Sequence, residues 1–203
     1  GVDTYWLSVP LRTGWTHKHD VYVDGGSNGF MFGIGANYSG TTGVMKDSKR
    51  DSYGGKLDLI YRLNKLQFSN KFSASYTSTQ DPVVEYSEYA RANPYYKKYD
   101  ENGDVNRWLE NSDFARAANP LYNASLNSRK EKSQLLLTNY LIVEYNPIHQ
   151  LRLRGKLGLT HTTNDGENFI SPEDTRYDSY DRTRKGSFTS TDQKSTRYDA
   201  SFT

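Results

Sequence analysis

The chain has 203 residues and no cysteine, which excludes disulfides and thiolate metal sites. Only 34% of its residues are hydrophobic while Tyr alone counts 17, a composition that is poor for a closed soluble core and ordinary for a wall with one face in water. The net charge of +2 does not favour nucleic acid as a partner, and the aliphatic runs are too short for a transmembrane helix.

Residues 1–16 show no clean period, and we expect a loop that enters the first strand. Apolar and polar residues then alternate over residues 17–25 and 30–39, which predicts two strands because side chains point to opposite faces in turn. The Gly- and Asn-rich segment between them predicts a compact turn. A loop of about eleven residues, ending in a charged run, leads to the next strand.

The clearest pattern is residues 51–77, which we interpret as two strands joined by a tight turn at residues 63–66. Alternation persists for about ten residues in each strand, longer than is usual in globular proteins. Tyr53, Tyr61, Phe68 and Tyr76 lie near the ends of the apolar rows. A soluble sandwich is compatible with this pattern, but lipid outside, a wet lumen and aromatic girdles at both interfaces explain it more directly.

Residues 78–131 form a long segment rich in Tyr, Asn, Pro and charge, with no sustained period. A connection of this length is usually functional or disordered, and its aromatic content argues against disorder. We expect short helical turns at residues 82–92 and 108–118.

Strand-like alternation returns over residues 132–145 and 150–162, with a tight turn at residues 146–149. In the second of these strands leucines alternate with Arg152, Arg154 and Lys156. Residues 163–193 predict a second long polar loop, and residues 194–203 begin another strand.

The connections alternate between short and long, as they do in bacterial outer-membrane barrels with short periplasmic turns and long extracellular loops. We therefore predict an all-β fold, a partial antiparallel up-and-down transmembrane β-barrel of about seven strands whose first strand runs inward. Bacterial barrels have an even number of strands and at least eight, so we expect a piece of a larger barrel. The lack of a starting Met and the end within an alternating run fit that expectation.

Six short stretches carry a resemblance to a known family. They are WLSVPLRTG at residues 6–14, HDVYVDGG at 19–26, GVMK at 43–46, YARANPYY at 89–96, YDENG at 99–103 and NPLYNA at 119–124. With these stretches, in the same order and over most of its length, the chain resembles the SusC/RagA-like family of TonB-dependent outer-membrane transporters from Bacteroidota.

The resemblance implies a barrel of twenty-two strands with an N-terminal plug domain inside it. Residues 1–203 would supply roughly strands two to eight, without the plug, the first strand and the C-terminal strands. It also implies import of glycans, or of peptides in some branches, with energy from TonB acting through the missing N-terminal region. A SusD-like surface lipoprotein would cap the outer side, and outer-membrane lipid would surround the barrel. No cofactor is implied.

Two groups of side chains are candidates for contact with substrate or partner. The first is the aromatic set of the 78–131 loop, which would stack on sugar rings, dock the lipoprotein or fill the loop's own small core: Tyr86, Tyr89, Tyr95, Tyr96 and Trp108. The second is the basic row Arg152, Arg154 and Lys156, which would face the lumen. This row would contact substrate or an acidic plug surface, or consist of solvated or plug-paired charges.

Residues 100–104 (DENGD) start like a calcium loop, but Val105 stands where an EF-hand needs Gly, so an acidic turn is expected. No spacing singles out a catalytic carboxylate pair, and we predict no enzyme activity. The alternative function is a soluble or surface β-rich carbohydrate-binding module. The transporter and the carbohydrate-binding module predict different surroundings for one set of apolar side chains. In a transporter they form an external apolar band, and in a module they are buried between two sheets. They are Leu57, Leu59, Phe72, Leu153 and Leu157.

Overall fold

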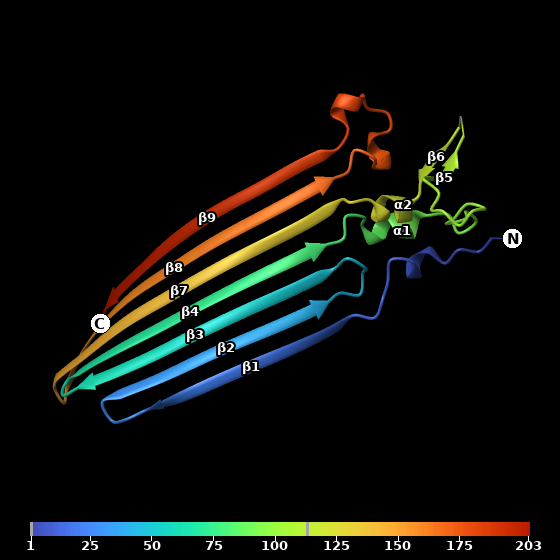
Figure 1. Cartoon of the computed structure of the whole chain (residues 1–203). Helices are drawn as coiled ribbons and strands as arrows, with labels where there is room; N and C mark the ends of the chain where they lie inside the picture. Colours follow the sequence, from blue (N-terminus) through green and yellow to red (C-terminus); the bar gives the residue numbers. More distant parts are fainter. Residues whose placement is uncertain (1, 113) are drawn as a thin grey trace.

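The computed structural model describes residues 2–112 and 114–203. Within them seven long strands form one antiparallel sheet in which each pairs with the next long strand along the chain (Figure 1). Their bounds are β1 Trp15–Gly26, β2 Phe30–Thr42, β3 Lys49–Leu63, β4 Leu66–Asp81, β7 Arg129–Ile148, β8 Leu151–Ile170 and β9 Ser187–Phe202. This order confirms the predicted all-β antiparallel fold.

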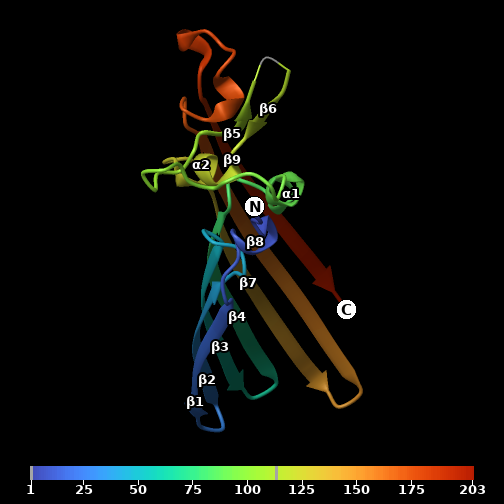
Figure 2. The ribbon, with the colours of Figure 1, turned by 90° about the vertical axis from the view of Figure 1, so that its right-hand side faces the viewer.

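The smaller elements gather beyond one end of the long strands, while the opposite end carries only short turns (Figures 1 and 2). They are η1 Trp6–Ser8, α1 Tyr86–Arg91, β5 Trp108–Asn111, β6 Arg116–Ala118, α2 Pro120–Ser125, η2 Thr175–Tyr177 and η3 Arg182–Arg184. No helix in the two described ranges is long and apolar enough to cross a membrane. The gathering at one end matches the predicted asymmetry of the connections.

The helical turn predicted at residues 82–92 is confirmed by α1, but the one predicted at residues 108–118 is wrong. Residues 108–118 instead contain the antiparallel ribbon β5–β6. Trp108 favours a strand, and its ring lies under the guanidinium of Arg116 on the partner strand, 5.8 Å from the ring centroid. This cross-strand pair explains why a ribbon forms there in place of a helical turn.

The long strands extend further than their alternation indicates. β7 and β8 have 20 residues each. The loop predicted at residues 163–193 is therefore limited to residues 171–186, the loop predicted at 78–131 to residues 82–128, and the connection before β3 to residues 43–48. Toward the loop end both faces carry polar side chains, such as Thr163 opposite Lys194 and Asp165 opposite Asp192, so pairing continues where alternation of polarity has stopped.

Cross-strand register aligns the apolar positions of all seven strands. One row runs through Val23, Ile34, Leu57, Phe72, Asn139, Leu159 and Tyr198. We call this side of the sheet the apolar face and the other side the polar face. No second sheet covers the apolar face within the described ranges, and Leu157 is 59% exposed. The side chains expected either in an external band or between two sheets thus share one uncovered face, as the barrel prediction requires.

Candidate functional site

The connections at the loop end pack against one another, and we call them the loop cluster: residues 2–14, 43–48, 82–112, 114–128 and 171–186. Its apolar centre consists of Trp6, Val84 and Tyr89, each only 3% exposed. The N-terminal segment is attached to the 82–128 loop by three hydrogen bonds, one of which runs from Thr4 Oγ1 to the Tyr96 carbonyl at 3.0 Å. The Thr4 amide donates to the Pro94 carbonyl at 2.8 Å, and Trp6 Nε1 donates to the Asn93 carbonyl at 3.0 Å.

Helix α2 is fixed by the fully buried side chain of Asn119. Its Oδ1 accepts the Leu121 amide at 3.0 Å, which caps the helix, and its Nδ2 donates to the Lys98 carbonyl at 3.1 Å. Pro120 occupies the first turn, where a missing N–H is tolerated. Asparagine followed by proline is thus a local signal for this helix, which the sequence analysis missed.

The two long loops are joined by side-chain hydrogen bonds. Asn123 Nδ2 donates to Thr175 Oγ1 at 2.8 Å, and Asn123 Oδ1 accepts the Thr175 amide at 3.2 Å. Arg107 forms an ion pair with Asp178 and donates to Tyr122 Oη at 2.8 Å. Two segments about fifty residues apart in sequence therefore form one packed unit.

Asp174 anchors the β8–β9 loop beneath this junction and is fully buried. Its carboxylate accepts the Arg176 amide at 3.0 Å and two guanidinium bonds, both 2.9 Å long. Burial by itself would raise the pKa of Asp174, but the bonds from Arg176 outweigh it, and the pKa lies below its ordinary value. The carboxylate therefore remains charged at neutral pH and holds the start of η2.

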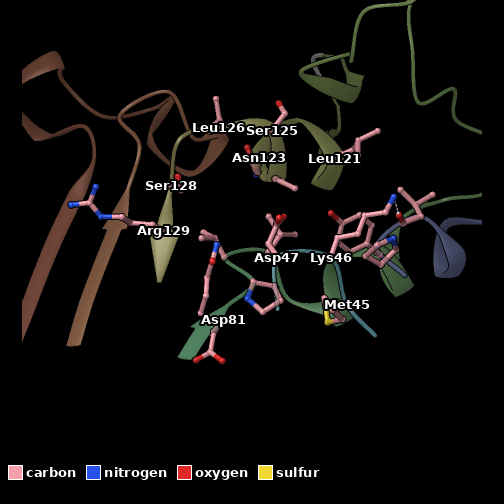
Figure 3. Close-up of a pocket in the computed structure, with 18 residues that line it drawn as sticks. Met45, Lys46, Asp47, Asp81, Leu121, Asn123, Ser125, Leu126, Ser128 and Arg129 are labelled. Carbon is pink, nitrogen blue, oxygen red and sulfur yellow. Dashed lines mark hydrogen bonds between the residues drawn. The ribbon is translucent and has the colours of Figure 1, made fainter. Parts of the chain in front are cut away.

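A cavity of about 300 Å³ lies below α2 (Figure 3). Five segments line it, from residues 9–10, 45–47, 80–84, 89 and 121–129. Its apolar lining includes Val9, Met45, Val84, Leu121, Ala124 and Leu126. Polar and apolar groups share its walls about equally, and its size lies at the lower end of the range for small-ligand sites.

Three of the four charged side chains around the cavity are engaged with other groups of the chain. They are Lys46, which donates to the Val9 carbonyl at 2.8 Å, Asp81, paired with Lys132 at 3.1 Å, and Arg129, paired with Glu167 at 3.2 Å. Figure 3 shows the side chains of Asp81 and Arg129 directed away from the cavity.

Asp47 differs from these three. Its carboxylate points toward α2 and the space below it (Figure 3). Its backbone is left-handed, with φ of 63°, a conformation that Asp tolerates at a tight turn. Burial, followed by the charges of Glu88 and Asp47, raises the pKa of Tyr89 to about 12. The Tyr89 phenol therefore keeps its proton.

Of the predicted loop aromatics, only Tyr89 lines this cavity, as a buried member of the apolar centre. Tyr95 is 78% exposed, Tyr86 lies on the outside of α1, Tyr96 bonds to Glu110, and Trp108 packs under Arg116. These side chains do not form a common stacking surface.

The predicted basic row lies near the short-turn end of β8, at the opposite end of the sheet from the loop cluster. Arg154 pairs with Glu144 at 3.2 Å, and Arg152 Nε donates to Asn146 Oδ1 at 3.4 Å. The Lys156 ammonium sits 4.4 Å from the ring centroid of Tyr140. The two groups of candidates are thus separate, and each basic side chain has a partner in the wall.

The predicted acidic turn at residues 100–104 is confirmed. Asp100 Oδ1 accepts the amides of Asn102 at 2.8 Å and Asp104 at 2.9 Å, and Gly103 supplies a φ of 90°. Across the part of the chain that the structure describes, no group of three His, Asp or Glu side chains is arranged to hold a metal ion.

An open sheet of long, sequentially paired strands, with one uncovered apolar face and elaborated loops at one end, is the fold of part of a β-barrel transporter. Three solved structures of RagAB share it. The RagAB peptide importer matches with a TM-score of 0.77 and 19% identity in its open-open state, and with 0.73 and 20% in its closed-closed state; each match covers 98% of this chain and 23% of that chain. The RagAB peptide transporter matches with a TM-score of 0.74 and 20% identity over 99% of this chain and 23% of that chain.

In sequence, the chain is 25% identical to TonB-dependent receptor P26 of Formosa agariphila over 150 residues, which is 73% of this chain and 15% of that protein. No protein-family model matches. These similarities confirm the resemblance to a piece of a SusC/RagA-like protein, and the matched proteins are a receptor and importers, in agreement with the prediction of no enzyme activity. The chain spans less than a quarter of the length of each of these proteins.

Proposed function

We propose that residues 1–203 form part of the barrel wall and the outer loops of a TonB-dependent outer-membrane transporter. The observation that carries this proposal is the single uncovered apolar face, aligned in register over seven strands, with all the elaborated loops at one end. Lipid would cover the apolar face, and the polar face would line the lumen. In such a barrel the chain would supply about strands two to eight.

The substrate that the loop cluster fits best is a peptide. A glycan site would present exposed aromatic rings side by side, whereas Tyr89 is buried and the other loop aromatics are dispersed. The cavity under α2 offers apolar side chains on part of its wall and a carboxylate, which suits a peptide better. The fold similarity to a peptide importer supports the same choice. A SusD-like lipoprotein would cover this side, and TonB would act through a region outside these residues.

The test is uptake by cells that express the full-length protein containing this chain. Fluorescently labelled peptides and neutral oligosaccharides of similar mass are supplied with TonB present or deleted. We expect peptide accumulation that depends on both the protein and TonB. TonB-independent accumulation would overturn the transporter proposal, and TonB-dependent uptake of the oligosaccharides alone would restore glycans as the substrate.

The carbohydrate-binding module is not favoured. In that function a second layer would cover Leu57, Leu157 and their neighbours, whereas the described chain leaves this face open.

A further inference from the structure

The charges that the cavity under α2 offers to a ligand depend on which of its lining side chains are engaged by other groups of the chain. Lys46 and Arg129 line it, yet both cations are engaged by other groups of the chain, and the Asp81 carboxylate is paired with Lys132. Of the four charged side chains around the cavity, Asp47 is then the one that takes part in no hydrogen bond or ion pair with the described residues. The space below α2 therefore presents one unengaged carboxylate, which suits a cationic group.

We propose that this cavity binds the terminal ammonium group of a substrate peptide, with the Asp47 carboxylate as its counter-ion. The assignment rests on the proposed function, because it names the part of a peptide that an importer would recognise. A charge-assisted hydrogen bond between an ammonium and a carboxylate is about twice as strong as a neutral one.

The neighbouring groups favour an ammonium over other cations. The apolar lining from Val84, Leu121 and Ala124 suits the side chain of the first peptide residue. The described residues contribute no three-carboxylate arrangement for a metal ion. A volume of about 300 Å³ is at the lower end for ligand sites and accommodates the start of a peptide rather than a whole oligosaccharide.

The position of Asp47 is fixed by the surrounding backbone. The Lys46 amide donates to the Pro10 carbonyl at 2.8 Å, and the Gly43 amide donates to the Ser48 carbonyl at 2.9 Å. These bonds hold the turn on both sides of Asp47. Because Asn tolerates the left-handed conformation as well as Asp does, Asp47→Asn removes the charge and keeps the turn.

The experiment measures fluorescence anisotropy with the full-length protein purified in detergent. The probes are Ala-Val-Ala-Val-Ala carrying a C-terminal dye, with either a free or an acetylated amino terminus. The control variant is Asp104→Asn, because the Asp104 side chain lies on the exposed acidic turn outside the cavity. We expect wild type to bind the free-amine peptide at least about tenfold more tightly, and Asp104→Asn to keep that ratio.

Asp47→Asn is expected to reduce the ratio to about one while binding the acetylated peptide as wild type does, which also shows that the variant is folded. Equal binding of the two peptides by wild type, or an unchanged ratio in Asp47→Asn, overturns the inference. Neither result decides the proposed function, because that function is tested by TonB-dependent uptake. A transporter can import the acetylated peptide without any preference for a free amino terminus. If the preference depends on Asp47 but uptake does not require TonB, the inference stands and the transporter proposal fails.

Discussion

Asn70 on β4 and Asn139 on β7 exchange two amide hydrogen bonds on the apolar face of the sheet, with N···O distances of 3.2 and 3.1 Å. Asn70 lies opposite Leu141, and Asn139 lies opposite Phe72. An amide in such surroundings is costly without a partner, and here each amide satisfies the other. The pair joins the two strands whose connection, residues 82–128, is the longest between neighbours in the described sheet.

This position suggests a role in fixing strand register. Hairpin register is set by the turn, but β4 and β7 share no short turn. A slip of two residues would keep every apolar side chain on the same face, so the apolar pattern alone does not oppose it. A slip that places Asn70 opposite Val143 would separate the two amides and leave both unpaired, whereas the opposite slip would place Asn70 directly opposite Asn139. The pair therefore opposes slippage in one direction.

Asn70→Leu alone is therefore expected to destabilise the full-length protein by about 1–3 kcal/mol, because it leaves the Asn139 amide unpaired. In Asn70→Leu/Asn139→Leu most of that loss is recovered, but the register is less well specified. Urea unfolding in lipid vesicles measures the first effect as a double-mutant cycle. A strictly additive cycle would show that the two amides do not interact.

Register is read from oxidative cross-linking of paired cysteines. Ser73→Cys and Thr138→Cys lie opposite each other on β4 and β7, and we expect their cross-linking yield to fall in the double leucine variant. The control pair, Lys56→Cys and Ser73→Cys, spans the β3–β4 hairpin, whose short turn fixes its register. An equal yield at both positions in all variants contradicts the register role.

The apolar face provides a second prediction. Leu157→Arg places a charge at an exposed position between Leu141 and Ala200, and a charge on the lipid face of a barrel costs about 2–4 kcal/mol near the membrane midplane. Thr162→Arg, on the polar face of the same strand, is expected to have a small effect. The measurement is the fraction folded in vesicles. Equal folding of the two variants would contradict a lipid-facing surface.

Alternation along residues 51–77 was sufficient to predict β3, β4 and the turn between them, since one face is mainly apolar and the other mainly polar. The ends of β8 and β9 were not predictable in this way. From Thr163 to Asn168 both faces of β8 are polar. Strand pairing, which depends on backbone hydrogen bonds, therefore cannot be recognised there from alternating polarity.

The cavity could not be predicted because its lining comes from segments that only the fold brings together, such as Val9, Asp47 and Ala124. The sequence left open whether Tyr89 contacts ligand or fills a core, and only its contact with Trp6 and Val84 places it in the core. Asn119-Pro120, in contrast, was readable as a helix start from local chemistry alone.

Acid is expected to loosen the β8–β9 loop. The pKa of Asp174 is lowered in the folded state from an ordinary value of 3.8. Its stabilising contribution is therefore complete above pH 3.8 and is lost as the pH falls through the lower folded value.

Pepsin cleavage within residues 171–186 should rise as the pH falls from 3.8 through the folded pKa of Asp174. In Asp174→Asn cleavage should be high on both sides of it, whereas Asp181→Asn, at an exposed position with no side-chain cap bond, should behave as wild type. A pH profile that is unchanged in Asp174→Asn would refute this role.

The junction between the two long loops makes a final prediction. Thr175→Val keeps the shape of the side chain but removes the oxygen that accepts from Asn123 Nδ2, and an unpaired buried donor costs about 1–3 kcal/mol. Because Asn123 lies on α2 and Thr175 on η2, hydrogen exchange should accelerate in both segments together. Thr189→Val, on the exposed part of β9, is the matched control and should change neither. Acceleration confined to one loop would mean that the loops fold independently, and the cavity under α2 would then not depend on the β8–β9 loop.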